Sequence, residues 1–234
     1  MKLVINQSNY IPWKGYFDLI RAADHFIIYD TAQYTKNDWR NRNQIKTPEG
    51  LKWMTIPVKR NFGQAIRKTV VQPGTWARKH WEMIKCNYSR APYFADYREE
   101  IAGLYEWAAE VEYLSSINHR FIRAICAILG ITTKITWSHE YLMAGGKTER
   151  LLGLCRSVGA DEYISGPAAI AYLDQEAFHQ AGIKVTWANY AGYPEYGQMF
   201  GPFENCVSVL DLIFNAGPQA ANFLKDIRSG EDNG

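Results

Sequence analysis

The densest group of side chains capable of chemistry lies between residues 29 and 50, in the sequence YDTAQYTKNDWRNRNQIKTPEG. Asp30 follows a short apolar run, where a general base or an amine-binding carboxylate would lie. Arg40 and Arg42 offer planar guanidinium groups suited to a carboxylate or phosphate, and in an extended chain they would form one anion clamp. Further candidates for substrate binding are Gln33, Lys36 and Asn43. The alternative is a solvated polar loop whose charges pair with one another.

A second polar and aromatic segment, residues 6–20 (NQSNYIPWKGYFDLI), joins an expected first strand to an expected helix. In α/β sheets, ligands bind beyond the carboxyl ends of strands, and the N-terminus of a following helix favours anions. Gly15 would permit a close backbone approach. The alternative is a rigid Pro-Trp plug that covers the end of the sheet. The candidates for substrate binding here are Asn6, Gln7, Tyr10, Trp13 and Tyr16.

A single histidine stands out in the segment 75–88 (TWARKHWEMIKCNY). Helical spacing places Trp76, His80 and Ile84 along one stripe of an expected helix. His80 could act as a general acid or base near neutral pH if it faces a site, and it could equally be a hydrogen-bonded core histidine. Both interpretations stay open.

A small turn in the segment 161–174 (DEYISGPAAIAYLD) could supply backbone donors to a ligand. Ser165 and Gly166 lie between an expected strand and an expected helix start, which is why we include them among the substrate-binding candidates. The pattern is not GxSxG, so it does not indicate a hydrolase nucleophile. A tight strand-to-helix turn without a ligand is the alternative.

These segments must be positioned by an alternating series of strands and helices. Near-continuous apolar runs such as LVI and FIIY suit strands covered on both faces, and the helical patterns between them imply crossover connections. We therefore predict an α/β fold with a Rossmann-like parallel or mixed sheet flanked by helices and a helical insertion in the middle of the chain. Strands are expected at 2–5, 25–29, 53–57, 69–72, 134–137, 162–164 and 184–187, and helices at 75–88, 93–109, 115–129, 147–158, 174–180, 208–215 and 218–227.

The 234 residues, nearly half of them apolar, can bury a substantial core. We expect one domain over residues 1–228, with a helical subdomain at about 92–130 and a disordered tail at 229–234. A net charge of +2 gives no global field for nucleic-acid binding, so we expect no nucleic-acid partner. Without a signal peptide or a long apolar run, we expect a cytoplasmic protein with no transmembrane segment. The oligomeric state stays open.

The four cysteines, at positions 86, 126, 155 and 206, have no metal-ligand spacing. We interpret them as buried free thiols, because most lie in apolar helical patterns. The sequence contains no metal-ligand cluster, and the cofactor stays unknown: a nucleotide is possible, and whether a metal is used stays open.

Taken together, the motifs identify a family. The chain resembles the WbqC-like protein family through YIPWKGYF, YDTAQYTKNDWRNRN, the W…H…NY…APYF series, YISGPAAIAYLD and the closing SVLDLIFN. Members typically begin the first motif with His-Gln-Pro, where this chain has Asn6-Gln7-Ser8, so a role for a histidine at position 6 is not carried over. The resemblance implies a link to bacterial O-antigen and related polysaccharide clusters and a glycine transferase activity.

Three functions are consistent with these features. The first is a transferase that attaches a small acyl or aminoacyl group, such as glycyl, to a nucleotide-linked or lipid-linked sugar, with Asp30 or His80 as the base. The second is nucleotide-dependent activation on a fold similar to the nucleotidylyltransferases, although Trp13-Lys14-Gly15-Tyr16 lacks both histidines of their HxGH motif. The third is a binding or scaffold protein without turnover. The expected partners of the transferase are small molecules: a sugar nucleotide and an amino-acid or acyl donor.

Overall fold

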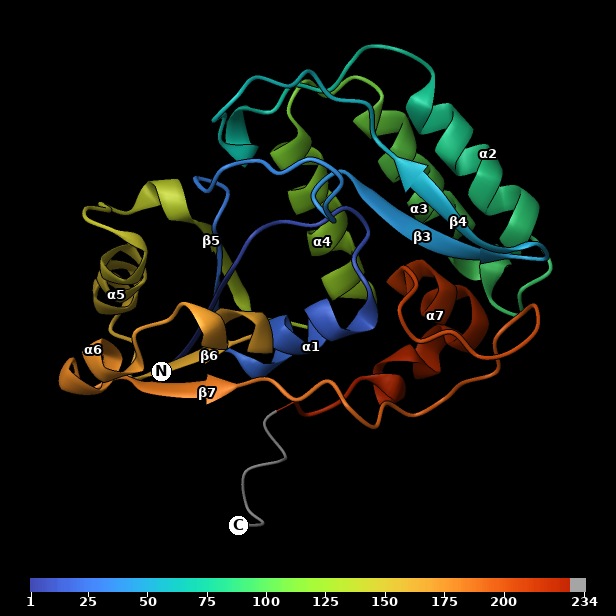
Figure 1. Ribbon diagram of the computed structural model, residues 1–234. Coiled ribbons are helices and arrows are strands. Elements are labelled where there is room, and N and C mark those ends of the chain that lie inside the picture. Colours follow the sequence, from blue (N-terminus) through green and yellow to red (C-terminus); the bar gives the residue numbers. More distant parts are fainter. Residues whose placement is uncertain (228–234) are drawn as a thin grey trace.

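A parallel five-stranded sheet forms the centre of the molecule (Figure 1). The computed structural model describes residues 1–227, so the predicted tail at 229–234 lies outside the described residues. The strands are β1 (Lys2–Asn6), β2 (His25–Ile28), β5 (Lys134–Trp137), β6 (Glu162–Ser165) and β7 (Lys184–Trp187), in the order β5-β2-β1-β6-β7. This is the strand order of a doubly wound dinucleotide-binding fold, whose topological switch point here lies between β1 and β6. The predicted Rossmann-like α/β sheet is confirmed, and all its strand pairs are parallel.

Helices cover both faces of the sheet, as the uninterrupted apolar strands require. Leu3 and Ile5 of β1 pack in one cluster with α5 (Lys147–Val158) and α6 (Gln175–Gln180). Val4, which points the other way, belongs to a larger cluster with α1 (Lys14–Ala22) and α4 (Leu114–Ile128). Because successive side chains of a strand alternate between faces, both clusters depend on the same short strand.

The segment between β2 and β5 is a long insertion that ends in the crossover helix α4. It contains an antiparallel hairpin of β3 (Arg42–Thr47) and β4 (Gly50–Thr55), a short 3-10 helix (Ile66–Lys68), α2 (Trp76–Tyr88) and α3 (Phe94–Ala108). The predicted strand at 69–72 is wrong, because Val70 and Val71 form only isolated bridges. Helices α3 and α4 occupy the range predicted as a helical subdomain, 92–130, and its separate status stays a prediction.

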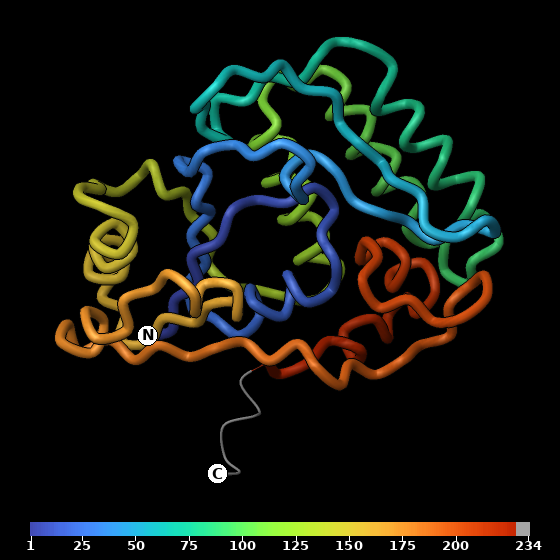
Figure 2. The backbone as a smooth tube through the Cα atoms, viewed as in Figure 1, coloured from blue at the N-terminus to red at the C-terminus, as the bar shows by residue number. Residues whose placement is uncertain are grey.

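The last part of the chain crosses the molecule from β7 to the hairpin (Figure 2). It has no helix or strand between residues 188 and 208, and then forms α7 (Val209–Ala216) and the 3-10 helix Gly217–Phe223. The buried Asp211 of α7 accepts hydrogen bonds from the hydroxyls of Tyr88 and Tyr196, each at 2.8 Å, and from Gln198 Nε2 at 2.7 Å. These bonds fix the irregular segment against α2. Two further 3-10 helices, Ser138–Glu140 and Pro167–Ala171, follow β5 and β6.

The C-terminus of α5 and the N-terminus of α6 are each defined by local geometry. Asp174 caps α6, since its carboxylate accepts from the Ala177 N–H at 3.1 Å. Gly159 ends α5 in the left-handed conformation, with φ of +70°. No helix within residues 1–227 is long and apolar enough to cross a membrane.

The carboxyl ends of β1 and β2 are joined by the buried side chain of Asp30. Its Oδ1 accepts from the Ser8 N–H at 2.8 Å, and its Oδ2 accepts from the Ser8 hydroxyl at 2.6 Å and from the Ser115 hydroxyl of α4. Burial raises the pKa of Asp30, while the hydrogen bonds from Ser115 and Ser8 oppose that rise because they stabilise the charged form. One carboxyl group therefore connects the first loop, β2 and α4.

We predict that Asp30→Ala lowers the free energy of unfolding by about 3 kcal/mol, because three buried donors would lose their acceptor. Urea unfolding followed by circular dichroism measures this change. Glu99→Ala is the control, since that side chain is 86% exposed and its loss should change stability by no more than about 0.5 kcal/mol. Equal unfolding midpoints for the two variants would contradict the role of Asp30.

Candidate functional site

The loop between β1 and α1 has an unusual backbone conformation at Ile11. The φ angle of this buried, β-branched residue is +36°, a region that such residues rarely adopt and that costs about 1–3 kcal/mol. Asn43 of β3 holds it there, since its Nδ2 donates to the carbonyls of Ile11 at 2.8 Å and Tyr10 at 3.2 Å. With Asp30 fixing Ser8, both ends of the turn are anchored. Asn43, predicted to bind substrate, thus also shapes the loop.

The indole of Trp13 lies against the first turn of α1. A Cβ atom on Gly15 would be 2.3 Å from Trp13 Cζ2, so only glycine fits beneath the ring. Tyr190 and Tyr193 contact the indole edge-to-face, with centroid distances of 5.3 and 5.5 Å. The close approach predicted at Gly15 is present, but the group that approaches is the protein's own indole.

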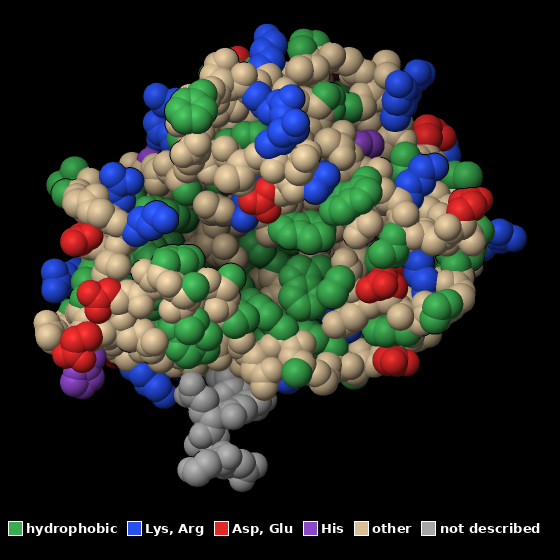
Figure 3. All heavy atoms as spheres, viewed as in Figure 1, with side chains coloured by type: hydrophobic (Ala, Val, Ile, Leu, Met, Phe, Trp, Pro, Cys, Tyr) green, Lys and Arg blue, Asp and Glu red, His purple; other side chains and the backbone are tan. Residues whose placement is uncertain are grey.

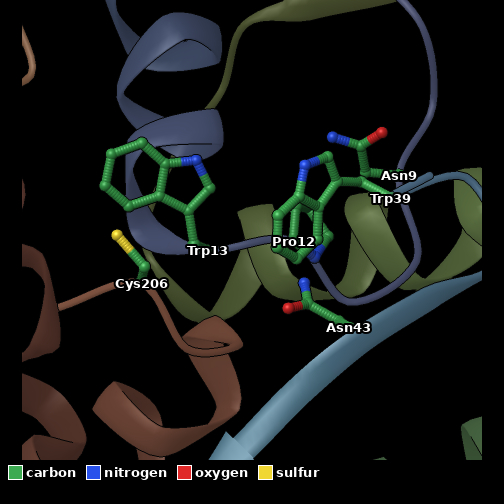
Figure 4. A pocket seen from close by; sticks show the side chains of 6 residues that line it. All are labelled: Asn9, Pro12, Trp13, Trp39, Asn43 and Cys206. Atoms are coloured by element: carbon green, nitrogen blue, oxygen red, sulfur yellow. The ribbon is translucent and has the colours of Figure 1, made fainter. Parts of the chain in front are cut away.

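A cavity of about 150 Å³ opens beside this indole (Figure 4). Figure 4 shows Trp13 and Cys206 on one side of it and Trp39, Asn9 and Asn43 on the other. The face drawn in Figure 3 is hollowed near its centre, and hydrophobic side chains gather around the hollow. Aromatic rings and amides thus meet in one small space. The lining residues are Asn9, Pro12, Trp13, Trp39, Asn43 and Cys206.

Trp39 extends this aromatic surface outward, towards the hairpin. Its side chain is 42% exposed and lies 5.5 Å, centroid to centroid, from Trp53 of β4. The Arg42 guanidinium lies 4.2 Å from the Trp53 ring centroid and donates to the Asn37 carbonyl at 2.5 Å. Arg42 therefore stacks on the outer tryptophan and is not a lining residue of the cavity.

Arg40 has a different environment. Its Nη1 donates to Asn9 Oδ1 and, at 3.4 Å, to the Ser8 carbonyl, and its Nη2 lies 3.7 Å from Asp38 Oδ2. The single anion clamp expected of Arg40 and Arg42 is corrected here. Arg40 lies in a turn and Arg42 begins β3, so the stretch is not extended. The two guanidinium groups have separate hydrogen-bond acceptors, although both lower the pKa of Asp38. Arg40 is the one connected to the cavity, through Asn9.

His80 lies in a buried chain of hydrogen bonds. The Tyr10 hydroxyl is 2.9 Å from His80 Nδ1 and 2.7 Å from the Tyr105 hydroxyl. Burial lowers the pKa of His80 to about 4, and a hydrogen bond to the Thr55 backbone opposes that shift. His80 is therefore held within the core by Tyr10 and by the backbone of Thr55. Tyr10, His80 and Asp30 do not line the cavity, and their predicted roles in binding and catalysis stay predictions.

Lys14 carries a charge in an unusually apolar setting. Its Nζ lies 4.7 Å from the ring centroid of Tyr193, 5.2 Å from that of Tyr196 and 5.4 Å from that of Phe203, and it donates to the Pro194 carbonyl at 3.2 Å. Burial lowers its pKa to about 8, against the opposing effects of Asp18, Cys206 and Asp211. Lys14 thus changes charge just above neutral pH and acts electrostatically on a lining residue.

The other candidates from the first loop, Asn6, Gln7 and Tyr16, do not line the cavity. Asn6 ends β1, and its Oδ1 accepts from the Gln7 N–H at 2.9 Å. The hydroxyl of the buried Tyr16 donates to the Gln7 carbonyl at 2.9 Å, and burial raises its pKa. Asn6 and Gln7 are half-buried at the switch point. Gln33 and Lys36 are exposed on the loop after β2.

Ser165 and Gly166 lie on the other side of the switch point, at the end of β6. Ser165 is buried, and its carbonyl accepts from the Ala188 N–H at 2.9 Å. A Cβ on Gly166 would be 3.5 Å from the Tyr190 hydroxyl. Because Tyr190 also contacts Trp13, one aromatic residue connects Gly166 to the cavity wall.

The two places where this fold usually holds a dinucleotide are occupied by the protein's own side chains. The pyrophosphate of such a ligand normally lies at the N-terminus of the first helix, and an acidic residue after the second strand binds its ribose. Here the Trp13 indole covers the first turn of α1, and Asp30 is buried against Ser8 and Ser115. The geometry therefore does not fit dinucleotide binding in that mode.

The prediction of buried cysteines is correct for two positions and wrong for two. Cys126 and Cys155 are buried, and burial raises the pKa of each thiol to about 12. Cys86 and Cys206 are exposed, because Cys86 faces outward on α2 and Cys206 lies in the irregular segment before α7. Within residues 1–227, no group of three His, Cys, Asp or Glu side chains could hold a metal.

Four residues of this region are not among the candidates predicted from the sequence: Asn9, Lys14, Trp39 and Cys206. Asn9 and Trp39 lie within the polar and aromatic segments already identified, so a wider selection would have included them. Cys206 and the aromatic rings around Lys14 come from the last fifty residues. Only the folded chain brings them to the first loop.

Comparison with known proteins gives the chain a family and one curated relative. The model of the WbqC-like protein family matches residues 7–223. Uncharacterized protein Rv1507c of Mycobacterium tuberculosis (strain ATCC 25618 / H37Rv) is 49% identical over 229 residues, which cover 97% of this chain and 99% of that protein. No solved structure matches the chain.

The buried His80 predicts a pH dependence of stability. Its pKa is about 4 in the folded protein against 6.5 for a free histidine, so the unfolded chain binds the proton more readily. The stability contributed by neutral His80 is complete above pH 6.5 and is lost as the pH falls towards 4, in all about 3 kcal/mol.

In His80→Asn, an amide oxygen can replace Nδ1 as acceptor, and this pH dependence should disappear. Urea unfolding across that pH range should then show a shallower loss of stability for the variant than for the parent protein. His25 and His119 are present in both proteins and cancel in the comparison. Parallel pH profiles would contradict the assignment.

Proposed function

Because the chain belongs to the WbqC-like protein family, we propose that it is a transferase in the synthesis of a surface polysaccharide or a related glycan. In this proposal it attaches a small acyl or aminoacyl group, such as glycyl, to a sugar held at the cavity between Trp13 and Trp39. The observation that carries the proposal is the composition of that cavity: two indoles and two amides in a space of about 150 Å³.

The chemistry of the lining suits a sugar ring. A pyranose has apolar C–H faces that pack on aromatic rings, and hydroxyls at its edge that both donate and accept hydrogen bonds. Asn9 and Asn43 offer amide groups, which can also do both. Asn43 Nδ2 is already bound to the loop backbone, so Asn9 has more capacity to bind a ligand.

The size of the cavity limits what it can enclose. Pockets that enclose ligands of drug size measure roughly 300–1,000 Å³, so about 150 Å³ accommodates one ring or a small acyl group. The remainder of an activated substrate would lie across the surrounding hollow. Arg40, which reaches the cavity through Asn9, is the cation we propose for a phosphate or carboxylate of that substrate.

In this proposal Asp30 and His80 act by positioning the loops. Asp30 holds Ser8, next to Asn9, and His80 holds Tyr10. Catalysis would then come mainly from orienting the donor carbonyl and the acceptor hydroxyl or amine, an effect that can lower a barrier by about 7–11 kcal/mol. Lys14 contributes a positive charge beside the cavity that decreases above about pH 8.

We predict that Trp39→Ala weakens sugar binding at least about tenfold while the melting temperature changes little, because the ring is partly exposed. Titration followed by ligand-detected NMR, with a panel of nucleotide sugars, measures the affinity. The matched control is Trp53→Ala, whose side chain is 41% exposed, contacts Trp39 and does not line the cavity. Equal losses in both variants would contradict the assignment of the cavity.

Native mass spectrometry of co-purifying small molecules tests the reaction class. A sugar nucleotide or an aminoacyl ester would support transfer. An adenylate, with release of pyrophosphate from ATP, would instead indicate an activating enzyme. If no ligand co-purifies and neither nucleotides nor sugars shift the melting temperature, the protein is a scaffold and the proposal fails.

A further inference from the structure

A turn near the candidate site presents a phenylalanine entirely to solvent. Phe62 is fully exposed at the tip of the segment 57–68 (PVKRNFGQAIRK), which follows β4. This segment contains four basic residues and no acidic one, whereas the whole chain has a net charge of only +2. The basic residues, all exposed, are Lys59, Arg60, Arg67 and Lys68. An apolar tip thus stands between two pairs of cations.

The turn is held in shape by the side chain of Gln64. Its Oε1 accepts from the Asn61 N–H at 2.9 Å, and its Nε2 donates to the Lys59 carbonyl and to Thr69 Oγ1, each at 3.1 Å. Gly63 provides the left-handed residue that the turn needs, with φ of +72°. Because these bonds fix the backbone on both sides, Phe62 is directed away from the core.

The turn is also fixed to the segment that contains Trp39. The Tyr34 N–H donates to the Gln64 carbonyl at 2.8 Å, and the Ile66 N–H donates to the Ala32 carbonyl at 2.9 Å. Backbone hydrogen bonds therefore join segment 57–68 to the loop after β2. In Figure 1 these two segments lie side by side at the edge of the molecule above β5. Trp39 is itself partly exposed beside them.

We propose that segment 57–68 docks on an anionic lipid surface. Phe62 would enter the boundary between headgroups and acyl chains, and the four cations would lie among the phosphates. A bilayer is favoured over a soluble polyanion because it satisfies both halves of the motif. The phenyl ring gains free energy only by leaving water, which a bilayer permits and a soluble polyanion does not.

This inference does not depend on the proposed function. Docking would keep the Trp13–Trp39 cavity close to a membrane, where lipid-linked acceptors are found. The readout is vesicle binding, which can succeed or fail independently of sugar binding.

The test is flotation of the full chain with vesicles of phosphatidylcholine and phosphatidylglycerol, compared with phosphatidylcholine alone. Binding should require the anionic lipid and weaken with added salt. Lys59→Gln/Arg60→Gln should reduce affinity about 30-fold and Phe62→Ser about tenfold. The matched control is Arg78→Gln/Lys79→Gln, which removes an exposed pair of equal charge from α2 and should leave binding unchanged.

Three results would overturn the proposal. One is failure to float with anionic vesicles, and another is an equal loss in the α2 control, which would indicate nonspecific attraction. The third is binding that Phe62→Ser leaves intact and that soluble polyphosphate displaces, which would assign the segment to a soluble anion. All the substituted side chains are exposed, so unchanged melting temperatures confirm that every variant is folded.

Discussion

The arrangement of the site depends on one buried carboxyl group. Asp30 lies at the end of β2, where a doubly wound fold usually presents an acidic residue to a ligand. Here it turns inward and accepts hydrogen bonds from Ser8 and from Ser115 of α4. A buried carboxylate is costly unless it is well hydrogen-bonded, so the surrounding donors are effectively compulsory. That requirement fixes the start of the first loop at Ser8, and Asn43 holds the strained turn at Ile11 further along it.

The protein thus has the strand order of a dinucleotide-binding fold, but its own side chains occupy the places where such a fold holds its ligand. Trp13 covers the first turn of α1, and Gly15 serves this internal contact. The cavity is displaced from the switch point towards the hairpin, where Asn43 both completes the loop and lines the space. Tyr190 still connects this cavity to Gly166 at the switch point. A substrate long enough to extend from the cavity to Gly166 would contact both the cavity lining and the switch point.

The irregular segment before α7 closes the site from the other side. Its position is set by a polar network in which Asp211 accepts from tyrosines and Gln198, while Lys46 Nζ donates to Gln198 Oε1 at 2.6 Å. The same segment surrounds Lys14 with aromatic rings and supplies Cys206. Hydrogen bonds between side chains, and not regular secondary structure, thus hold the irregular segment in place beside the cavity.

The sequence by itself determined the sheet and most helices, because strands such as Leu3–Ile5 are uninterruptedly apolar and Gly159 and Asp174 mark helix ends locally. It also selected the two segments that supply most of the residues lining the cavity. Tertiary structure decided the hairpin strand Arg42–Thr47, whose polar sequence forms a strand through its partner β4. It also separated the two arginines and brought Cys206 to Trp13. Those outcomes depend on contacts between distant parts of the chain, and on the hydrogen bonds that burial requires, which no local pattern specifies.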